Sequence, residues 1–258
     1  MTAVPLHYTV DGPPDGPTLV LGSSLGTTSA LWEPQIPVLA KRLRVVRYDH
    51  RGHGQSPVPL GPYQLDELGS DVLAMMDRLG VQRFHVGGIS LGGMVAMWIA
   101  AKAPERVDRM TLLCTSARLG PPEMWQTRAR TVRAEGIGAI ANTLLGRWVP
   151  AEFATRRPDI VENLRAMLMG TPVDGYAGCC AAIETMDLEP DLERVTAPTL
   201  VIAGLEDEST PPVHAQRIAA GIAGSRLTLI AGAAHLANVS RPELVGQLMS
   251  DHLAQGSS

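Results

Sequence analysis

The chain has 258 residues, of which 45% are hydrophobic and 19% charged, a composition typical of a globular protein and not of a disordered one. Its net charge is −4 and its lysines and arginines are scattered, which argues against nucleic acid or an anionic membrane as partner. Because the first residues do not resemble a signal peptide and no apolar run is long enough to span a bilayer, we expect a cytoplasmic protein.

The opening segment LHYTV (6–10) predicts an edge strand that leads into a turn rich in proline and glycine. Short apolar runs then alternate with longer helical patterns. We expect strands at 18–22, 44–49, 83–88, 109–114, 198–204 and 225–231, and helices around 65–79, 92–103, 212–221 and 242–254. Uninterrupted apolar strands are typical of a parallel sheet that is covered on both faces. The alternation therefore predicts a doubly wound, mostly parallel α/β sheet.

This alternation is interrupted between residues 118 and 195, where amphipathic helical patterns follow one another without a convincing strand. Such an insertion is either a cap over a site or an ordinary helical subdomain that contributes stability. Since it follows the carboxyl end of a strand, where open α/β sheets place their sites, we expect a cap. The predicted organisation is a core domain of residues 1–117 and 196–258 with a helical cap at 118–195.

The segment Gly88-Ile89-Ser90-Leu91-Gly92 matches the pattern G-x-S-x-G between a predicted strand and a predicted helix. In that context the pattern is typical of a nucleophile elbow, a tight turn that exposes the serine hydroxyl at the end of the sheet. The alternative is a serine that caps the following helix. A helix cap does not require glycine on both sides of the serine, so we identify Ser90 as the candidate nucleophile.

A serine hydroxyl needs a general base at neutral pH, and in this arrangement the base follows the acid along the chain. Three histidines come late enough: His214, His235 and His252. His214 lies at the start of one helical pattern and His252 lies within another. His235 lies in the loop GAAHLANVS, directly after a predicted strand and therefore at the edge where sites lie. We predict that His235 is the base.

The acid should follow the preceding strand, where LEDESTPP offers Glu206, Asp207 and Glu208. We select Asp207, which would hold the His235 tautomer and stabilise its imidazolium form. The acidic residues could instead belong to a solvated loop, an interpretation that we keep for Glu206 and Glu208.

An oxyanion intermediate needs two N–H donors. The Leu91 N–H directly follows the serine, and by position the Leu25 N–H in the loop after the strand 18–22 is the second predicted donor. A further segment, YDHRGHGQS (48–56), matches the pattern D-x-R-G-x-G-x-S. We expect this segment to tie a crossover loop near the site, and we do not expect His50 or His53 to be catalytic because both precede the acid.

Several segments together resemble the 3-oxoadipate enol-lactonases of the α/β-hydrolase superfamily: GSSLGTTSALWEPQIPVL, RVVRYDHRGHGQS, GGISLGGMVAMWIA, MWQTR, GYAGCCAAI and AAHLANVS. The resemblance extends from about residue 6 to residue 253, and one departure is Ser23, where asparagine is usual in the family. It implies an α/β-hydrolase fold and hydrolysis of a small enol-lactone with a pendant carboxylate in the β-ketoadipate pathway. No metal or nucleotide-binding motif is visible, so we expect no cofactor and no metal.

To bind the carboxylate of such a substrate, the cap would need a cationic side chain. Trp125 and Arg128 are three residues apart and share a helix face. A guanidinium binds a carboxylate with two hydrogen bonds and an indole provides an apolar wall, so we predict that both bind substrate, with Trp148 as a further wall. Arg128 could instead be a surface charge.

The open alternatives for the activity are a carboxylesterase, a carbon–carbon bond hydrolase, a perhydrolase-like enzyme and a non-catalytic receptor on the same fold.

Overall fold

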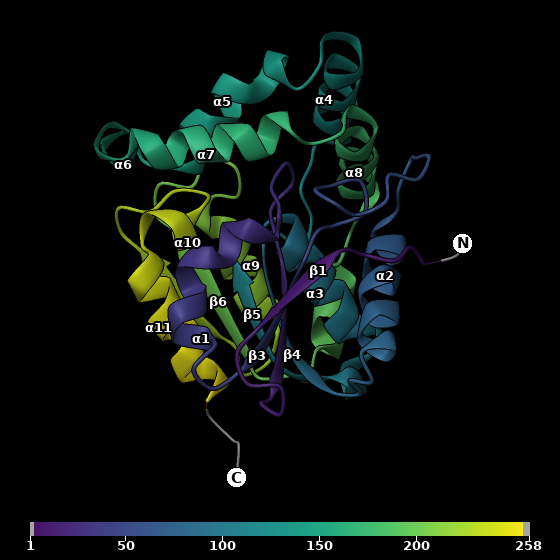
Figure 1. Ribbon diagram of the computed structural model, residues 1–258, viewed down its shortest axis with the longest axis vertical. Coiled ribbons are helices and arrows are strands. Elements are labelled where there is room, and N and C mark those ends of the chain that lie inside the picture. The colour runs from purple at the N-terminus through teal and green to yellow at the C-terminus, as the bar shows by residue number, and fades with distance from the viewer. Residues whose placement is uncertain (1–2, 255–258) are drawn as a thin grey trace.

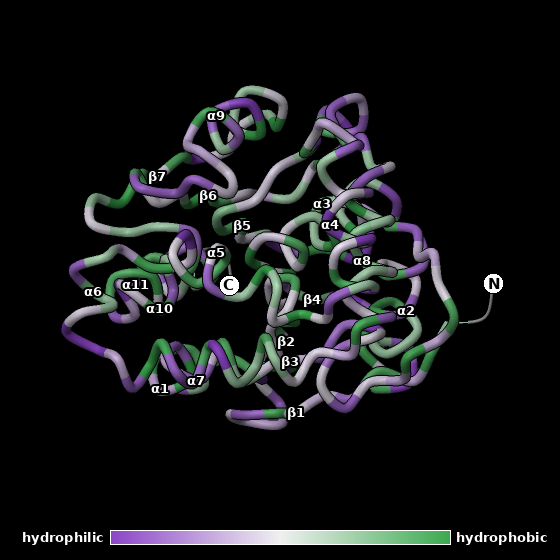
Figure 2. Tube along the Cα trace, turned by 90° about the horizontal axis from the view of Figure 1, so that it is seen from above, coloured by the Kyte–Doolittle hydropathy of each residue, from purple (hydrophilic) through white to green (hydrophobic). Residues whose placement is uncertain are grey.

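The computed structural model describes residues 3–254 and contains one seven-stranded sheet with the order β1-β3-β2-β4-β5-β6-β7 (Figure 1). Every neighbouring pair is parallel except the edge strand β1 with β3. Seen from above, β1 and β7 lie at opposite sides of the sheet (Figure 2). The strands are β1 (Tyr8–Asp11), β2 (Thr18–Gly22), β3 (Arg44–Tyr48), β4 (Phe84–Ile89), β5 (Val107–Leu113), β6 (Thr199–Gly204) and β7 (Arg226–Ile230). The predicted strands and the mostly parallel sheet are confirmed.

Helices cover both faces of this sheet, which confirms the doubly wound arrangement. On one face α1 (Ile36–Leu39) packs with α11 (Pro242–Leu253). On the other face lie α2 (Leu65–Arg78), α3 (Leu91–Lys102) and α9 (Pro212–Gly221). Short helical segments complete the core: η1 (Ser29–Gln35), η2 (Pro104–Arg106), η3 (Glu189–Arg194) and α10 (Ala237–Ser240). Among residues 3–254, no helix combines the length and the hydrophobicity that crossing a membrane would need.

Five helices form the insertion between β5 and β6 and lie over the carboxyl edge of the sheet (Figure 1). They are α4 (Pro122–Glu135), α5 (Gly138–Trp148), α6 (Ala151–Arg156), α7 (Pro158–Met169) and α8 (Val173–Thr185). The four longer helices confirm the helical character that the sequence predicts for this insertion. Helix α6 was not predicted, because it has only six residues, too few to show a helical period.

The order of the strands places a crevice beside β2. The chain passes from β2 to β3 on one side and then to β4 on the other side. In open α/β sheets, ligands bind outside the carboxyl ends of the strands at such a reversal. The loops that follow β2 and β4, which contain Leu25 and Ser90, therefore meet at the position where the fold favours a site.

Candidate active site

Ser90 lies in a strained turn between β4 and α3. Its backbone has φ 54° and ψ −118°, which is rare for a residue with a side chain. A Cβ atom at Gly88 would overlap the Gly92 backbone, and one at Gly92 would overlap the backbone of Gly22. Sterics therefore require the two glycines of the motif. The Thr115 hydroxyl donates to the Ser90 carbonyl at 2.7 Å and helps to hold the turn.

His235 lies in the loop between β7 and α10, and its Nδ1 is 3.0 and 3.2 Å from the two carboxylate oxygens of Asp207. Asp207 follows β6 and also accepts the N–H groups of Ser209 (2.8 Å) and Thr210 (2.9 Å) and the Thr210 hydroxyl (2.7 Å). Burial raises the pKa of Asp207, but the His235 charge and these hydrogen bonds outweigh burial and lower the pKa below its ordinary value. The ionised carboxylate orients Nδ1–H and leaves Nε2 available to accept a proton.

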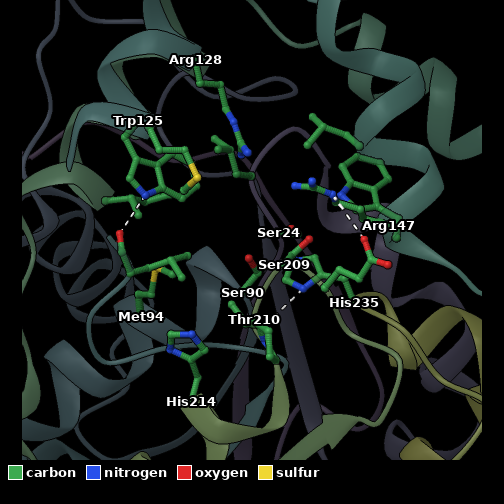
Figure 3. Close-up of a pocket in the computed structure, with 18 of the residues that line it drawn as sticks. Ser24, Ser90, Met94, Trp125, Arg128, Arg147, Ser209, Thr210, His214 and His235 are labelled. Carbon is green, nitrogen blue, oxygen red and sulfur yellow. Dashed lines mark hydrogen bonds and ion pairs between the residues drawn. The ribbon is translucent and has the colours of Figure 1, made fainter. Parts of the chain in front are cut away.

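Ser90 and His235 line the same cavity of about 250 Å³ (Figure 3). Ser90 is 7% exposed, and the cavity reaches it from the side of the insertion. Within residues 3–254 no hydrogen bond joins the Ser90 hydroxyl to the His235 ring, and such contacts are often long before a substrate binds. The structure thus brings together the three residues selected from the sequence, with Asp207 behind His235.

The two predicted oxyanion donors flank Ser90. Leu25 lines the cavity from the loop after β2, and Leu91 is the first residue of α3. In the described part of the chain, neither the Leu25 N–H nor the Leu91 N–H donates to a protein acceptor. The Gly92 N–H donates to the Ser23 carbonyl at 3.0 Å and joins the two loops. Both N–H groups remain available for an anion at Ser90.

Trp125 and Arg128 of α4 both line the cavity, and the Arg128 guanidinium stacks over the Trp125 indole, 4.5 Å from its centre. Figure 3 shows Arg128 extending from the insertion into the cavity. No carboxylate of residues 3–254 lies within ion-pair distance of Arg128. The Trp125 indole N–H donates to the Leu119 carbonyl at 2.8 Å, which fixes the ring. Trp148 lines the cavity from α5, so all three predicted substrate-binding residues face the same space.

The cavity also contains polar residues that the sequence reasoning did not select. His214 of α9 lines it, with Nδ1 2.8 Å from the Ser116 hydroxyl, and burial lowers the pKa of this histidine. Arg147 of α5 lies 3.7 Å from Glu208, and both line the cavity. Glu208 is exposed, as expected, but also forms this ion pair. The position of His214 and Glu208 after β6, at the carboxyl edge, was the signal that could have identified them.

The insertion also contacts the loop of the candidate base. The Leu236 N–H donates to the Trp148 carbonyl at 2.7 Å, and the His235 N–H donates to the Arg147 carbonyl at 3.4 Å. These carbonyls belong to the last turn of α5, where a helix leaves acceptors without internal partners. Helix α5 therefore helps to fix the backbone that presents His235.

No cluster of three or more histidine, cysteine, aspartate or glutamate side chains that could hold a metal occurs between residues 3 and 254. Cys114, Cys179 and Cys180 are buried and free. The polar side chains that line the cavity with Ser90 include two histidines, two arginines, one glutamate and three hydroxyl groups: His214, His235, Arg128, Arg147, Glu208, Ser24, Ser209 and Thr210.

His50 and His53, in the loop after β3, are fully buried next to the loop that contains Leu25. His50 Nε2 is 2.9 Å from the Ser23 carbonyl oxygen, and His53 Nε2 is 3.0 Å from the Gly26 nitrogen. Burial lowers the pKa of His50 to about 3 and that of His53 to about 4. Both rings are neutral in the folded protein near pH 7.

The lowered pKa values of these two histidines predict that the folded protein loses stability in acid. The unfolded chain binds protons at its histidines below about pH 6.5, whereas the folded protein keeps His53 neutral down to about pH 4. Stability is therefore complete above the unfolded pKa and falls as the pH decreases toward the folded pKa. We expect the free energy of unfolding to decrease by about 2 kcal/mol for His53 between pH 7 and pH 5.

Urea unfolding at these two pH values measures this decrease. The variant His53→Gln should show a decrease that is about 2 kcal/mol smaller, because glutamine does not titrate. An unchanged pH dependence in this variant would contradict the expectation.

The comparisons with known proteins agree with this geometry. The family described as "alpha/beta hydrolase fold" matches residues 17–242. The 3-oxoadipate enol-lactonase 2 of Acinetobacter baylyi is 39% identical over 93% of this chain and 90% of that protein. The crystal structure of the enol-lactonase from Burkholderia xenovorans LB400 is 38% identical, with a TM-score of 0.95 over 97% of this chain and 96% of that one. RutD of Variovorax paradoxus, provisionally named a carbamate hydrolase, is 32% identical over 99% and 98% of the two chains.

A match of this extent, on a sheet with a strained serine turn after β4, establishes the family. The chain belongs to the α/β-hydrolase fold family and, within it, to the enol-lactonases, which are hydrolases that act on carboxylic ester bonds.

Proposed function

We propose that the chain hydrolyses 3-oxoadipate enol-lactone to 3-oxoadipate, a reaction of the β-ketoadipate pathway. The observation that carries this proposal is the Arg128 guanidinium, which has no carboxylate partner in residues 3–254 and extends into the cavity of Ser90. An arginine in this position suits a substrate that has a carboxylate beside its lactone ring. The volume of about 250 Å³ favours a small substrate.

In the proposed mechanism Ser90 Oγ attacks the lactone carbonyl while His235 Nε2 accepts its proton. The oxyanion that forms accepts hydrogen bonds from the Leu25 and Leu91 N–H groups, each of which contributes about 3 kcal/mol to transition-state stabilisation. The ring C–O bond then breaks, and the enolate takes a proton from His235 and becomes a ketone within the acyl chain. Water activated by His235 attacks the serine ester and releases 3-oxoadipate and free Ser90. Asp207 holds the imidazole throughout.

We also propose that residues 118–195 act as a cap domain on a core of residues 1–117 and 196–258. The support is the lining of the cavity, to which the insertion contributes Trp125, Arg128 and Trp148 and the core contributes Ser90 and His235. In this division the cap binds the substrate and the core performs the chemistry. Residues 1–2 and 255–258 of the proposed core range lie outside the described residues.

Removal of Arg128 separates substrate binding from chemistry. Arg128→Ala should raise KM for the enol-lactone roughly 10- to 100-fold, because a charged hydrogen-bonded pair is lost, and should change kcat/KM for p-nitrophenyl acetate less than about twofold. Arg128→Lys should be intermediate, because lysine keeps the charge but not the paired hydrogen bonds. The matched control is Arg130→Ala, since Arg130 is exposed on the same helix and outside the cavity. Equal losses on both substrates would remove the proposed role.

The activity itself is tested by comparing kcat/KM for four substrates without added metal. These are the enol-lactone, p-nitrophenyl acetate, a diketo acid with a cleavable carbon–carbon bond, and a carbamate, the substrate class in the name of RutD. The proposal predicts the highest value for the lactone, by an order of magnitude or more. A preference of that size for any other substrate would replace the lactonase assignment with the corresponding activity.

A further inference from the structure

The segment 49–56 matches a motif of this fold, yet the proposed mechanism uses none of its side chains. Its two fully buried imidazoles, His50 and His53, face the loop Ser23–Gly26, which we call the oxyanion loop because it presents the Leu25 N–H. The two rings lie edge to face, with centres 6.1 Å apart. Two buried neutral histidines therefore lie beside the proposed oxyanion donor.

The contacts of the oxyanion loop hold three consecutive peptide groups. His50 Nε2 contacts the Ser23 carbonyl oxygen, which belongs to the first peptide, at 2.9 Å. The Ser24 carbonyl, in the second peptide, accepts the N–H (3.1 Å) and the hydroxyl (2.8 Å) of Thr27. The Gly26 N–H, in the third peptide, donates to His53 Nε2 at 3.0 Å. The Leu25 N–H belongs to the second peptide, and because a peptide is planar and trans it points away from the carbonyl that Thr27 holds.

These contacts require a different tautomer of each histidine. The Ser23 carbonyl can only accept a hydrogen bond, so His50 carries its proton on Nε2. The Gly26 N–H can only donate, so His53 Nε2 is unprotonated and its Nδ1–H points to the Arg51 carbonyl at 3.3 Å. Exchange of either tautomer, or protonation of His53, would place two donors or two acceptors opposite each other. The pKa values of both rings, lowered by burial, keep these forms at neutral pH.

The segment that carries the two rings is itself firmly anchored. The Arg51 guanidinium lies between them in sequence and is buried, with Nε 2.6 Å from Asp71 and a second nitrogen 2.8 Å from Glu67. Gly52 packs directly against Gly175 of α8, where a Cβ on either residue would overlap the other backbone. The imidazoles are therefore fixed supports and not mobile side chains.

We propose that His50 and His53 are positioning residues, whose opposite neutral tautomers hold the peptides on both sides of the Ser24–Leu25 peptide and thereby set the direction of the Leu25 N–H toward the oxyanion. This inference rests on the proposed role of the Leu25 N–H. If a neighbouring peptide loses its imidazole partner, the Ser24–Leu25 peptide can rotate with it. The Leu25 N–H then turns away and no longer stabilises the oxyanion in the transition state. Loss of one such donor reduces kcat by roughly 10²- to 10³-fold, which is the upper limit of the expected effect.

Two variants of His53 separate this role from a general structural one. His53→Gln carries an amide oxygen near the position of Nε2, so it can still accept the Gly26 N–H. His53→Asn has a similar amide on a shorter side chain and cannot reach. His85→Gln is the matched control, since His85 is a buried histidine on β4 that lies outside the cavity. Melting temperatures establish that each variant is folded.

The readouts are kinetics with p-nitrophenyl acetate and the affinity for phenylboronic acid, which forms a tetrahedral adduct with an active-site serine and places an oxygen in the oxyanion site. We expect His53→Asn to lower kcat and boronate affinity by a similar factor, about 10- to 100-fold, with KM changed less than about threefold. His53→Gln and His85→Gln should stay within about threefold of the wild type. Equal impairment of the Asn and Gln variants, or unchanged boronate affinity in a slow Asn variant, would overturn the proposal.

A second measurement uses the unmodified protein and does not depend on the folding of a variant. Nitrogen-15 NMR of the imidazoles at pH 7 should show His50 protonated on Nε2 and His53 protonated on Nδ1. The same tautomer in both rings, or a charged ring, would overturn the proposal. Because the kinetic test uses an ester and a boronate, a failure to turn over the enol-lactone would overturn the proposed substrate and leave this inference standing.

Discussion

Ser90→Ala should lower kcat for the enol-lactone by roughly 10⁶-fold, the loss found when the nucleophile of a Ser-His-Asp enzyme is removed alone. The side chain that attacks the carbonyl is then absent, and no other hydroxyl occupies the strained turn at the carboxyl end of β4. Residual rate would come from the Leu25 and Leu91 N–H groups and from substrate binding. Progress curves with the purified variant and with the wild type measure the ratio.

The control for this substitution is Ser225→Ala, because Ser225 is half-buried, its hydroxyl donates to the Ala219 carbonyl in α9, and it lies outside the cavity. This variant should keep the wild-type kcat. Ser90→Ala should also retain its melting temperature to within a few degrees, since alanine removes a single oxygen. A folded Ser90→Ala variant with more than about 1% of the wild-type kcat would contradict the nucleophile assignment.

Asp207→Asn should lower kcat by about 10⁴-fold. The amide oxygen can still accept the N–H groups of Ser209 and Thr210, which holds the amide nitrogen toward His235. An amide N–H facing Nδ1 selects the tautomer with its proton on Nε2, and that tautomer cannot accept the proton of Ser90. The fold and the cavity remain, so KM should change far less than kcat.

Glu206→Gln is the matched control for this substitution, because Glu206 is the exposed carboxylate next to Asp207. It should have wild-type kcat and KM. Steady-state kinetics with the lactone at pH 7 make the comparison. If Asp207→Asn retained more than about a tenth of the activity, or if Glu206→Gln were impaired as severely, the acid would have to be reassigned.

The sheet could be predicted from the sequence because the burial of each strand determines the residue types within that strand. The residues of β2, β4 and β6 are all buried, and a strand buried on both faces appears in the sequence as a continuous apolar run. Ser90 could be selected for a similar reason, since the two glycines that its turn requires lie within the same five residues. His235 and Asp207 followed from their positions after predicted strands.

The remaining features depend on contacts between distant segments. His214 and Arg147 line the cavity because α9 and the end of α5 converge there, which no local pattern encodes. The Arg147 and Trp148 carbonyls accept hydrogen bonds from the backbone of the His235 loop. Residue types do not reveal such backbone contacts. The contacts of His50 and His53, on which their proposed positioning role rests, could not be predicted, because the order along the chain only excluded these histidines as bases. A buried imidazole can also serve as a hydrogen-bond donor or acceptor.

The most direct test of the account is the mass of the acyl-enzyme. Protein mixed with the enol-lactone and quenched in acid within the first turnover should carry an adduct with the full mass of the lactone on the peptide that contains Ser90, because the leaving oxygen stays attached to the opened ring. The ester p-nitrophenyl acetate should add only an acetyl group to the same serine. Consumption of the lactone with that peptide unmodified, or with the adduct on another residue, would contradict the account.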